Sequence, residues 1–137
     1  MDTANYQREI IELHQFFTDW FAGRLSQSEV HFARFSQVIA DGFALITPDG
    51  VLIERDTLQD RIFAGYGQRP DFHVWIKNPQ IRHRQDDIIV VTYEEWQRTS
   101  EGGQTARLST AIFRENDNTP NGLEWLHVHE TWLSQNA

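Results

Sequence analysis

The stretch that decides the fold is residues 72–133, FHVWIKNPQIRHRQDDIIVVTYEEWQRTSEGGQTARLSTAIFRENDNTPNGLEWLHVHETWL. Long runs rich in β-branched and aromatic residues alternate there with polar clusters that are typical of turns, at 85–87, 101–103 and 116–122. Pro79 indicates a bulge or a sheet edge, because proline cannot donate to a ladder of hydrogen bonds. The four strands that this pattern predicts are Phe72–Arg84, Ile88–Arg98, Thr105–Arg114 and Leu123–Leu133.

Helical patterns dominate the chain before this stretch. Apolar residues recur at three- and four-residue spacings from about Thr3 to Arg24, which predicts a long amphipathic helix. Gly23 stands where a left-handed residue would end that helix. A short helix is expected at 28–34, and another is expected to start at Asp56 or Thr57 and to stop at the glycines 65 and 67.

Asp41-Gly42 is the strongest local turn signal in the first half of the chain. It predicts a two-residue hairpin between the strands Phe35–Ala40 and Phe43–Thr47. The next turn is expected at 48–50, Pro-Asp-Gly. Helices first and meandering strands afterwards indicate one α+β domain over residues 1–137.

The composition excludes several classes of function. The 137 residues contain no cysteine, so thiol catalysis and disulfides are excluded and a cytoplasmic location is expected. The formal net charge of −8 argues against nucleic acid as a partner. No apolar run approaches the roughly 20 residues of a membrane span, and the acidic start with Asp2, Glu9 and Glu12 is unlike a signal peptide. We therefore expect no membrane partner.

Four features carry a resemblance to a known family. They are residues 43–50 (FALITPDG) before a short helix, residues 92–96 (TYEEW), Arg107 in the next strand, and residues 125–132 (WLHVHETW). In this order and spacing the chain resembles the SnoaL-like branch of the nuclear transport factor 2-like superfamily, which is related to the calcium/calmodulin-dependent kinase II association domain. The resemblance spans nearly the whole chain.

That resemblance implies a fold more sharply than a function. It implies a cone-shaped, curved, antiparallel or mixed sheet wrapped on the long N-terminal helix, with a pocket between them and a homodimer formed through the outer sheet face. It implies no single activity, because the superfamily includes isomerases, cyclases, epoxide hydrolases, dehydratases and non-catalytic association modules. The acid/base dyads of its enzymes have no residue-by-residue counterpart in this sequence.

His127 and His129 are the sharpest chemical feature. Residues two apart share one face of a strand, with Cα atoms about 6.5 Å apart, whereas Glu130 faces the opposite side. Two imidazoles at that spacing could chelate a metal, contribute polar groups to a pocket, or be ordinary strand histidines. No HExxH motif or carboxylate triad accompanies them, so we expect neither a metal nor another cofactor.

Arg107 and the pair Glu94 and Glu95 are the charged candidates for the pocket. An inward-facing arginine needs a carboxylate, which could come from Glu94, from Glu95 or from an anionic ligand. Adjacent strand residues face opposite sides, so only one of the two glutamates can reach the pocket. A pocket-facing glutamate among aromatic residues would have a raised pKa and could act as a general base.

Trp20, Trp75, Trp96 and Trp125 could line the cavity for a flat apolar ligand, or could simply form the core. Our leading hypothesis is a homodimer that binds a small, partly apolar organic molecule, for which an anionic group is one option. Catalysis is left open. If there is any, it would be isomerisation, cyclisation or dehydration without a cofactor, with His127, His129, Glu94 and Arg107 as candidate residues. The alternative is a non-catalytic association module with a vestigial pocket.

Overall fold

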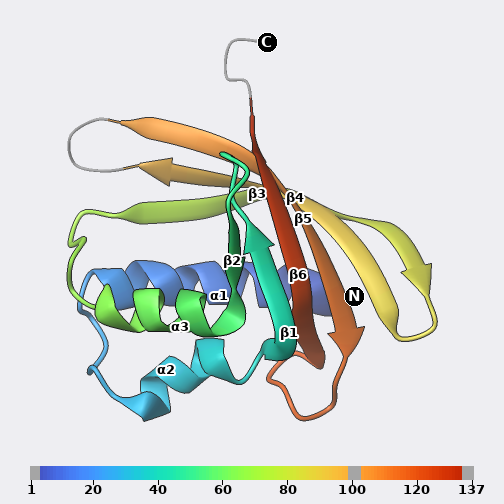
Figure 1. Ribbon diagram of the computed structural model, residues 1–137, viewed down its shortest axis with the longest axis horizontal. Helices are drawn as coiled ribbons and strands as arrows, with labels where there is room; N and C mark the ends of the chain where they lie inside the picture. The colour runs from blue at the N-terminus through green and yellow to red at the C-terminus, as the bar shows by residue number, and fades with distance from the viewer. Residues whose placement is uncertain (1–3, 99–102, 134–137) are drawn as a thin grey trace.

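A curved six-stranded sheet forms one layer of the molecule, and three helices cover its concave face (Figure 1). The computed structural model describes residues 4–98 and 103–133. The helices are α1 (Asn5–Phe21), α2 (Glu29–Ser36) and α3 (Arg55–Ala64). The strands are β1 (Ile39–Ile46), β2 (Leu52–Glu54), β3 (His73–Gln85), β4 (Ile88–Arg98), β5 (Gln104–Glu115) and β6 (Leu123–Trp132).

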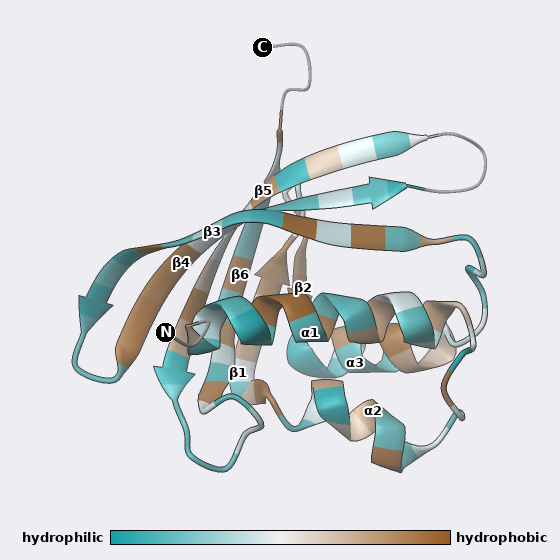
Figure 2. Cartoon of the chain, turned by 180° about the vertical axis from the view of Figure 1, so that it is seen from behind, coloured by the Kyte–Doolittle hydropathy of each residue, from teal (hydrophilic) through white to brown (hydrophobic). Residues whose placement is uncertain are grey.

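The sheet has the order β2-β1-β6-β5-β4-β3. All neighbours are antiparallel except β1 and β6, which run parallel, so the sheet is mixed. The predicted α+β fold, with a curved sheet on a long N-terminal helix, is confirmed. Figure 2 shows the hydrophobic first half of β4 in brown, and its residues Ile89 and Val91 are almost completely buried against the helices.

The four long strands were predicted within two residues at each described end. Pro79 lies in β3, which is an edge strand, at a register shift between Lys77 and Gln80. The predicted sheet edge and the predicted bulge at this proline are therefore both confirmed. Gly23 has φ +73°, as the helix end requires. The expected helix start at Thr3, and residues 101 and 102 of one expected turn, lie outside the described residues.

The hairpin predicted at Asp41-Gly42 is wrong. Residues 39–46 form one continuous strand, β1, which pairs with β6 on one side and with β2 on the other. Asp41 and Gly42 occupy an irregularity in its register with β6, between Ile39 and Ala44. The long neighbouring strand thus outweighs a local turn propensity, because it satisfies the backbone groups on both sides of the bulge. Phe35, expected in a strand, is instead the buried last turn of α2.

A buried carboxylate fixes α1 against the sheet. Glu9 has no solvent exposure and accepts hydrogen bonds from Trp125 Nε1 at 2.8 Å and from Arg34 Nη2 at 2.8 Å. These contacts join α1 to β6 and to α2. Because a buried charge requires such partners, the rotation of α1 about its axis is defined, and with it the direction of the side chains further along the helix.

Candidate functional site

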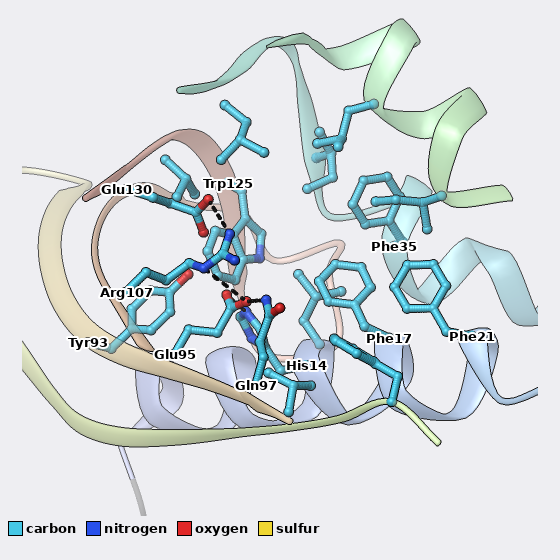
Figure 3. A pocket seen from close by; sticks show the side chains of 18 of the residues that line it. His14, Phe17, Phe21, Phe35, Tyr93, Glu95, Gln97, Arg107, Trp125 and Glu130 are labelled. Carbon is cyan, nitrogen blue, oxygen red and sulfur yellow. Dashed lines mark hydrogen bonds and ion pairs between the residues drawn. The ribbon is translucent and has the colours of Figure 1, made fainter. Parts of the chain in front are cut away.

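A cavity of about 280 Å³ lies between the concave face of the sheet, α1 and α3. Most of its wall is apolar and much of it is aromatic, with contributions from Phe17, Phe21, Phe35, Phe43 and Phe72. Polar side chains gather at one end, as Figure 3 shows. Because ionisable groups gather at one end and most of the remaining wall is apolar, with Arg69 as an exception, the cavity has a defined polarity.

The polar end is a chain of four ionisable side chains from four elements. His14 Nε2 lies 2.9 Å from Glu95 Oε1, and Arg107 Nε lies 4.0 Å from Glu95 Oε2. Arg107 Nη1 donates to Glu130 Oε1 at 3.1 Å. His14 comes from α1, Glu95 from β4, Arg107 from β5 and Glu130 from β6, so the chain of charges crosses the site (Figure 3).

Strand alternation explains the two central positions. In β4, Ile89, Val91 and Tyr93 point inward, and Glu95 continues that series. In β5, Arg107 pairs directly with Glu95 across the ladder and follows the inward positions of Phe113, Ala111 and Ser109. Ala111 and Ser109 are small, which leaves room for the guanidinium above the sheet.

His14 donates from both ring nitrogens. Its Nδ1 lies 2.7 Å from the carbonyl oxygen of Ile10, and its Nε2 faces the Glu95 carboxylate. Both partners are acceptors, so the arrangement favours the imidazolium form. Burial lowers the pKa of His14, but the charge and hydrogen bond of Glu95 outweigh burial and leave that pKa raised. Burial conversely raises the pKa of Glu95, and His14 and Arg107 outweigh it, so the pKa of Glu95 is lowered.

Glu130 is the side chain poised to exchange a proton. Burial, reinforced by the negative charge of Glu95, raises its pKa to about 7 despite the opposing effect of Arg107. Burial, again with Glu95, also raises the pKa of Tyr93 well above its ordinary value, so Tyr93 remains a neutral phenol. The site therefore offers one carboxyl group that can gain or lose a proton near neutral pH beside a fixed cation.

Residues 6–134 match the family model described as sucrose-6-phosphate phosphohydrolase C-terminal. The chain belongs to this family. Sucrose-phosphatase 1 of Nicotiana tabacum is 25% identical over 130 residues, which cover 91% of this chain and 30% of that protein. The chain thus spans about a third of the length of the curated relatives that it matches.

Solved structures of other proteins have the same fold as this chain. A nuclear transport factor 2-like protein of unknown function from Pseudomonas aeruginosa has a TM-score of 0.84 and 27% identity, covering 96% of this chain and all of the other. The CaMKII hub of S. rosetta has a TM-score of 0.60 and 15% identity over 79% of this chain and 84% of its own. The resemblance to the nuclear transport factor 2-like superfamily and its association domains is confirmed at the level of the fold.

Three of the residues predicted from the sequence line the cavity of this protein, namely Glu95, Arg107 and Trp125. Of the two carboxylates considered for Arg107, Glu95 faces inward and Glu94 does not. Glu94 lies on the outer face, where it accepts hydrogen bonds from Asn78 at 2.7 Å and from Trp96 at 3.0 Å. Its pocket position is corrected, because inward and outward residues alternate strictly along β4.

The expected pocket positions of His127 and His129 are also corrected. In β6, Trp125 pairs with Phe113 but His127 pairs with Ile112, so Leu126 is one extra residue in the strand. This bulge reverses the alternation after Trp125 and turns Val128 and Glu130 inward. His127 is consequently half-buried and His129 exposed, both on the outer side.

The other three tryptophans lie outside the cavity lining. Trp20 is completely buried in the helical core, where its Nε1 donates to the carbonyl oxygen of Ile62 at 2.8 Å. Trp75 and Trp96 stack on each other on the outer face, with ring centroids 6.2 Å apart. Their pocket positions are corrected by the same alternation that places Val74 inward in β3.

Sequence reasoning missed His14 and Glu130. His14 interrupts the apolar face of α1 beside Leu13 and Phe17, and a polar ring in such a stripe is the signal that could have revealed it. Glu130 was placed opposite the histidines, and that placement is what brings it to Arg107.

In residues 4–98 and 103–133 no group of three or more potential ligands could hold a metal, and no helix is long and apolar enough to cross a bilayer.

The substitution Glu130→Gln should flatten the dependence of stability on pH. The folded protein keeps a proton on Glu130 up to about pH 7, whereas an ordinary glutamate loses it near 4.5. The folded state therefore binds more protons in that interval, and its free energy of unfolding falls as pH rises. Denaturant unfolding between about pH 5 and pH 7 should show the native protein losing about 2 kcal/mol relative to the variant.

The control is Glu54→Gln, which removes a carboxylate that is exposed on β2. This variant should keep the native slope. Equal slopes for the native protein and Glu130→Gln would contradict the assignment of a raised pKa to Glu130.

Proposed function

We propose that the cavity binds a small, largely apolar organic molecule whose polar group faces Arg107 and Glu130. The observation that carries this proposal is the row of four ionisable side chains at one end of a largely apolar cavity. Such a combination of apolar wall and a few convergent polar groups is typical of small-molecule sites. Buried charges beside an empty cavity do not stabilise the fold, because their desolvation costs free energy that packing contacts do not return there.

The volume sets the size of the occupant. An engineered apolar cavity of about 150 Å³ accommodates benzene, so a cavity of about 280 Å³ accommodates about 11 non-hydrogen atoms by proportion. The apolar wall disfavours a sugar phosphate, because each buried hydroxyl group would need a hydrogen-bond partner. We therefore take the match to sucrose-phosphatases as evidence of family, and the occupant as a compound with few hydroxyl groups.

Proton transfer is the chemistry that this end of the cavity supports. A carboxyl group with a pKa of about 7 can act as acid or base at neutral pH, and Glu130 has that property. Arg107, hydrogen-bonded to Glu130, would stabilise negative charge that develops on the bound molecule. Isomerisation, cyclisation or dehydration without a cofactor fits these two groups, with Glu130 in the role first considered for His127, His129 and Glu94.

Filling the cavity should abolish binding. Leu58 on α3 lines the cavity and is half-buried, so Leu58→Trp adds bulk to the hollow from the helical side. Isothermal titration with 3-phenylpropanoate and 3-phenylpropanamide, each of about 11 non-hydrogen atoms, should show binding to the native protein and none to the variant.

The matched control is Leu108→Trp, which places the same bulk on the outer face, where Leu108 is 37% exposed. Undiminished binding to Leu58→Trp would show that these probes bind outside the cavity, and the proposal would then fail.

A second candidate function, homodimeric association, is supported by the outer face of the sheet. The stacked pair of Trp75 and Trp96 is only half-buried there, and Leu108 is 37% exposed. Apolar groups gathered on one sheet face are typical of surfaces that pair with another copy. The similarity to a CaMKII hub in fold is compatible with this role.

Leu108→Asp should shift such a dimer toward monomer, because it would place a carboxylate in the interface without a partner. Sedimentation equilibrium at micromolar concentration measures the shift. Val30→Asp is the control, since Val30 is 84% exposed on α2 and away from the sheet. A native protein that sediments as a monomer at that concentration would refute the association role.

A further inference from the structure

The guanidinium of Arg107 already has two carboxyl partners within the protein. Its Nη1 donates to Glu130 at 3.1 Å, and its Nε lies 4.0 Å from Glu95. A carboxylate entering the inner end would have to displace Glu130 and would meet the charge of Glu95 as well. The inner end therefore suits a neutral hydrogen-bonding group better than an anion.

A second arginine, Arg69, lines the same cavity. Its guanidinium carbon lies 5.4 Å from the centroid of the Phe21 ring and 5.3 Å from that of Phe72. Within residues 4–98 and 103–133 it makes no ion pair with a carboxylate. Its side chain is exposed, so it stands where the cavity meets the solvent.

Arg69 lies at the end of the cavity away from the four ionisable side chains. Figure 3 shows Phe21, over which Arg69 lies, on the side opposite Arg107 and Glu130. Phe17 and Phe35 lie between these two ends in the same view. The cavity thus has at its mouth a cation without a carboxylate partner among the described residues, an apolar middle, and at its inner end a guanidinium that already contacts two carboxyl groups.

The backbone around Arg69 is held in place. The Arg69 amide donates to the carbonyl oxygen of Phe21 at 2.9 Å, and the Gly67 amide donates to that of Trp20 at 3.1 Å. Gly67 has φ +68°, a conformation that glycine adopts without strain. Two hydrogen bonds thus tie the backbone of this turn to the end of α1, and the guanidinium itself lies over the rings of Phe21 and Phe72.

We infer that the occupant is a monocarboxylate: its neutral polar group faces Arg107 and Glu130, its apolar body fills the middle of the cavity, and its carboxylate lies at the mouth against Arg69; this inference rests on the proposed function. A single guanidinium matches one carboxylate in charge and geometry. A phosphate monoester, with nearly two negative charges, fits less well on a chain whose net charge is −8.

Arg69→Gln tests the inference by titration calorimetry with three probes. They are 3-phenylpropanoate, its neutral amide 3-phenylpropanamide, and 2-phenylethyl phosphate. The native protein should bind the carboxylate more tightly than the amide and the phosphate. Arg69→Gln should weaken binding of the carboxylate about fivefold, the upper range for a partly exposed ion pair, and leave binding of the amide unchanged.

Arg61→Gln is the matched control, because Arg61 is exposed on α3, does not line the cavity and carries the same charge. It should leave the affinity for all three probes unchanged, and both variants should melt at the native temperature.

The outcomes separate the two proposals. If the carboxylate and the amide both bind but Arg69→Gln leaves carboxylate affinity unchanged, the role of Arg69 is refuted and the pocket function stands. Tighter binding of 2-phenylethyl phosphate than of 3-phenylpropanoate would overturn the choice of a monocarboxylate. If no probe binds the native protein at millimolar concentration, or if Leu58→Trp retains all binding, the proposed function fails with the inference.

Discussion

Arg107 brings a permanent positive charge to the concave side of the sheet, where only 17% of its side chain is exposed. A charge in that position must be compensated, and the two neighbouring strands each supply a carboxylate, Glu95 and Glu130. Glu95 in turn contacts His14 of α1, whose Nε2 lies 2.9 Å from the carboxylate. The contact thereby links the helix to the sheet, and the rotation of α1 that Glu9 defines is the one that aims His14 at Glu95.

The same arrangement explains why the hollow persists beside the charges. The four ionisable side chains contact one another across the inner end, so an apolar side chain in that space would leave a buried charge without its partner. Toward the mouth the wall consists of rings and branched side chains from α1, α3 and the start of β3, and Arg69 lies over its last two rings. Size and polarity of an occupant follow from this geometry, whereas the fold by itself is compatible with many functions.

The amino-acid pattern was sufficient to predict the long strands, the first helix and the inward direction of Arg107, because each depends on a period that is visible locally. The prediction was wrong where pairing with a neighbouring strand, which the local sequence does not show, decides the local structure. Leu126 is an extra residue in the pairing of β6 with β5. This one-residue shift turns Glu130 toward the cavity and turns His127 and His129 away from it. The hairpin prediction at Asp41-Gly42 was wrong for the same reason, since β6 pairs with β1 on both sides of these two residues. His14 was missed because its role requires Glu95, 81 residues away in sequence.

The most direct test of this account is a carbon-13 NMR titration of the Glu130 side-chain carboxyl in the native protein and in Arg107→Gln. The account predicts a midpoint of about 7 in the native protein, since burial and Glu95 disfavour the ionised form. It predicts a higher midpoint in the variant, because the neighbouring cation that lowers the pKa of Glu130 has been removed. A midpoint near 4.5 in the native protein, or one that does not respond to the loss of Arg107, would contradict the chain of charges on which the site depends.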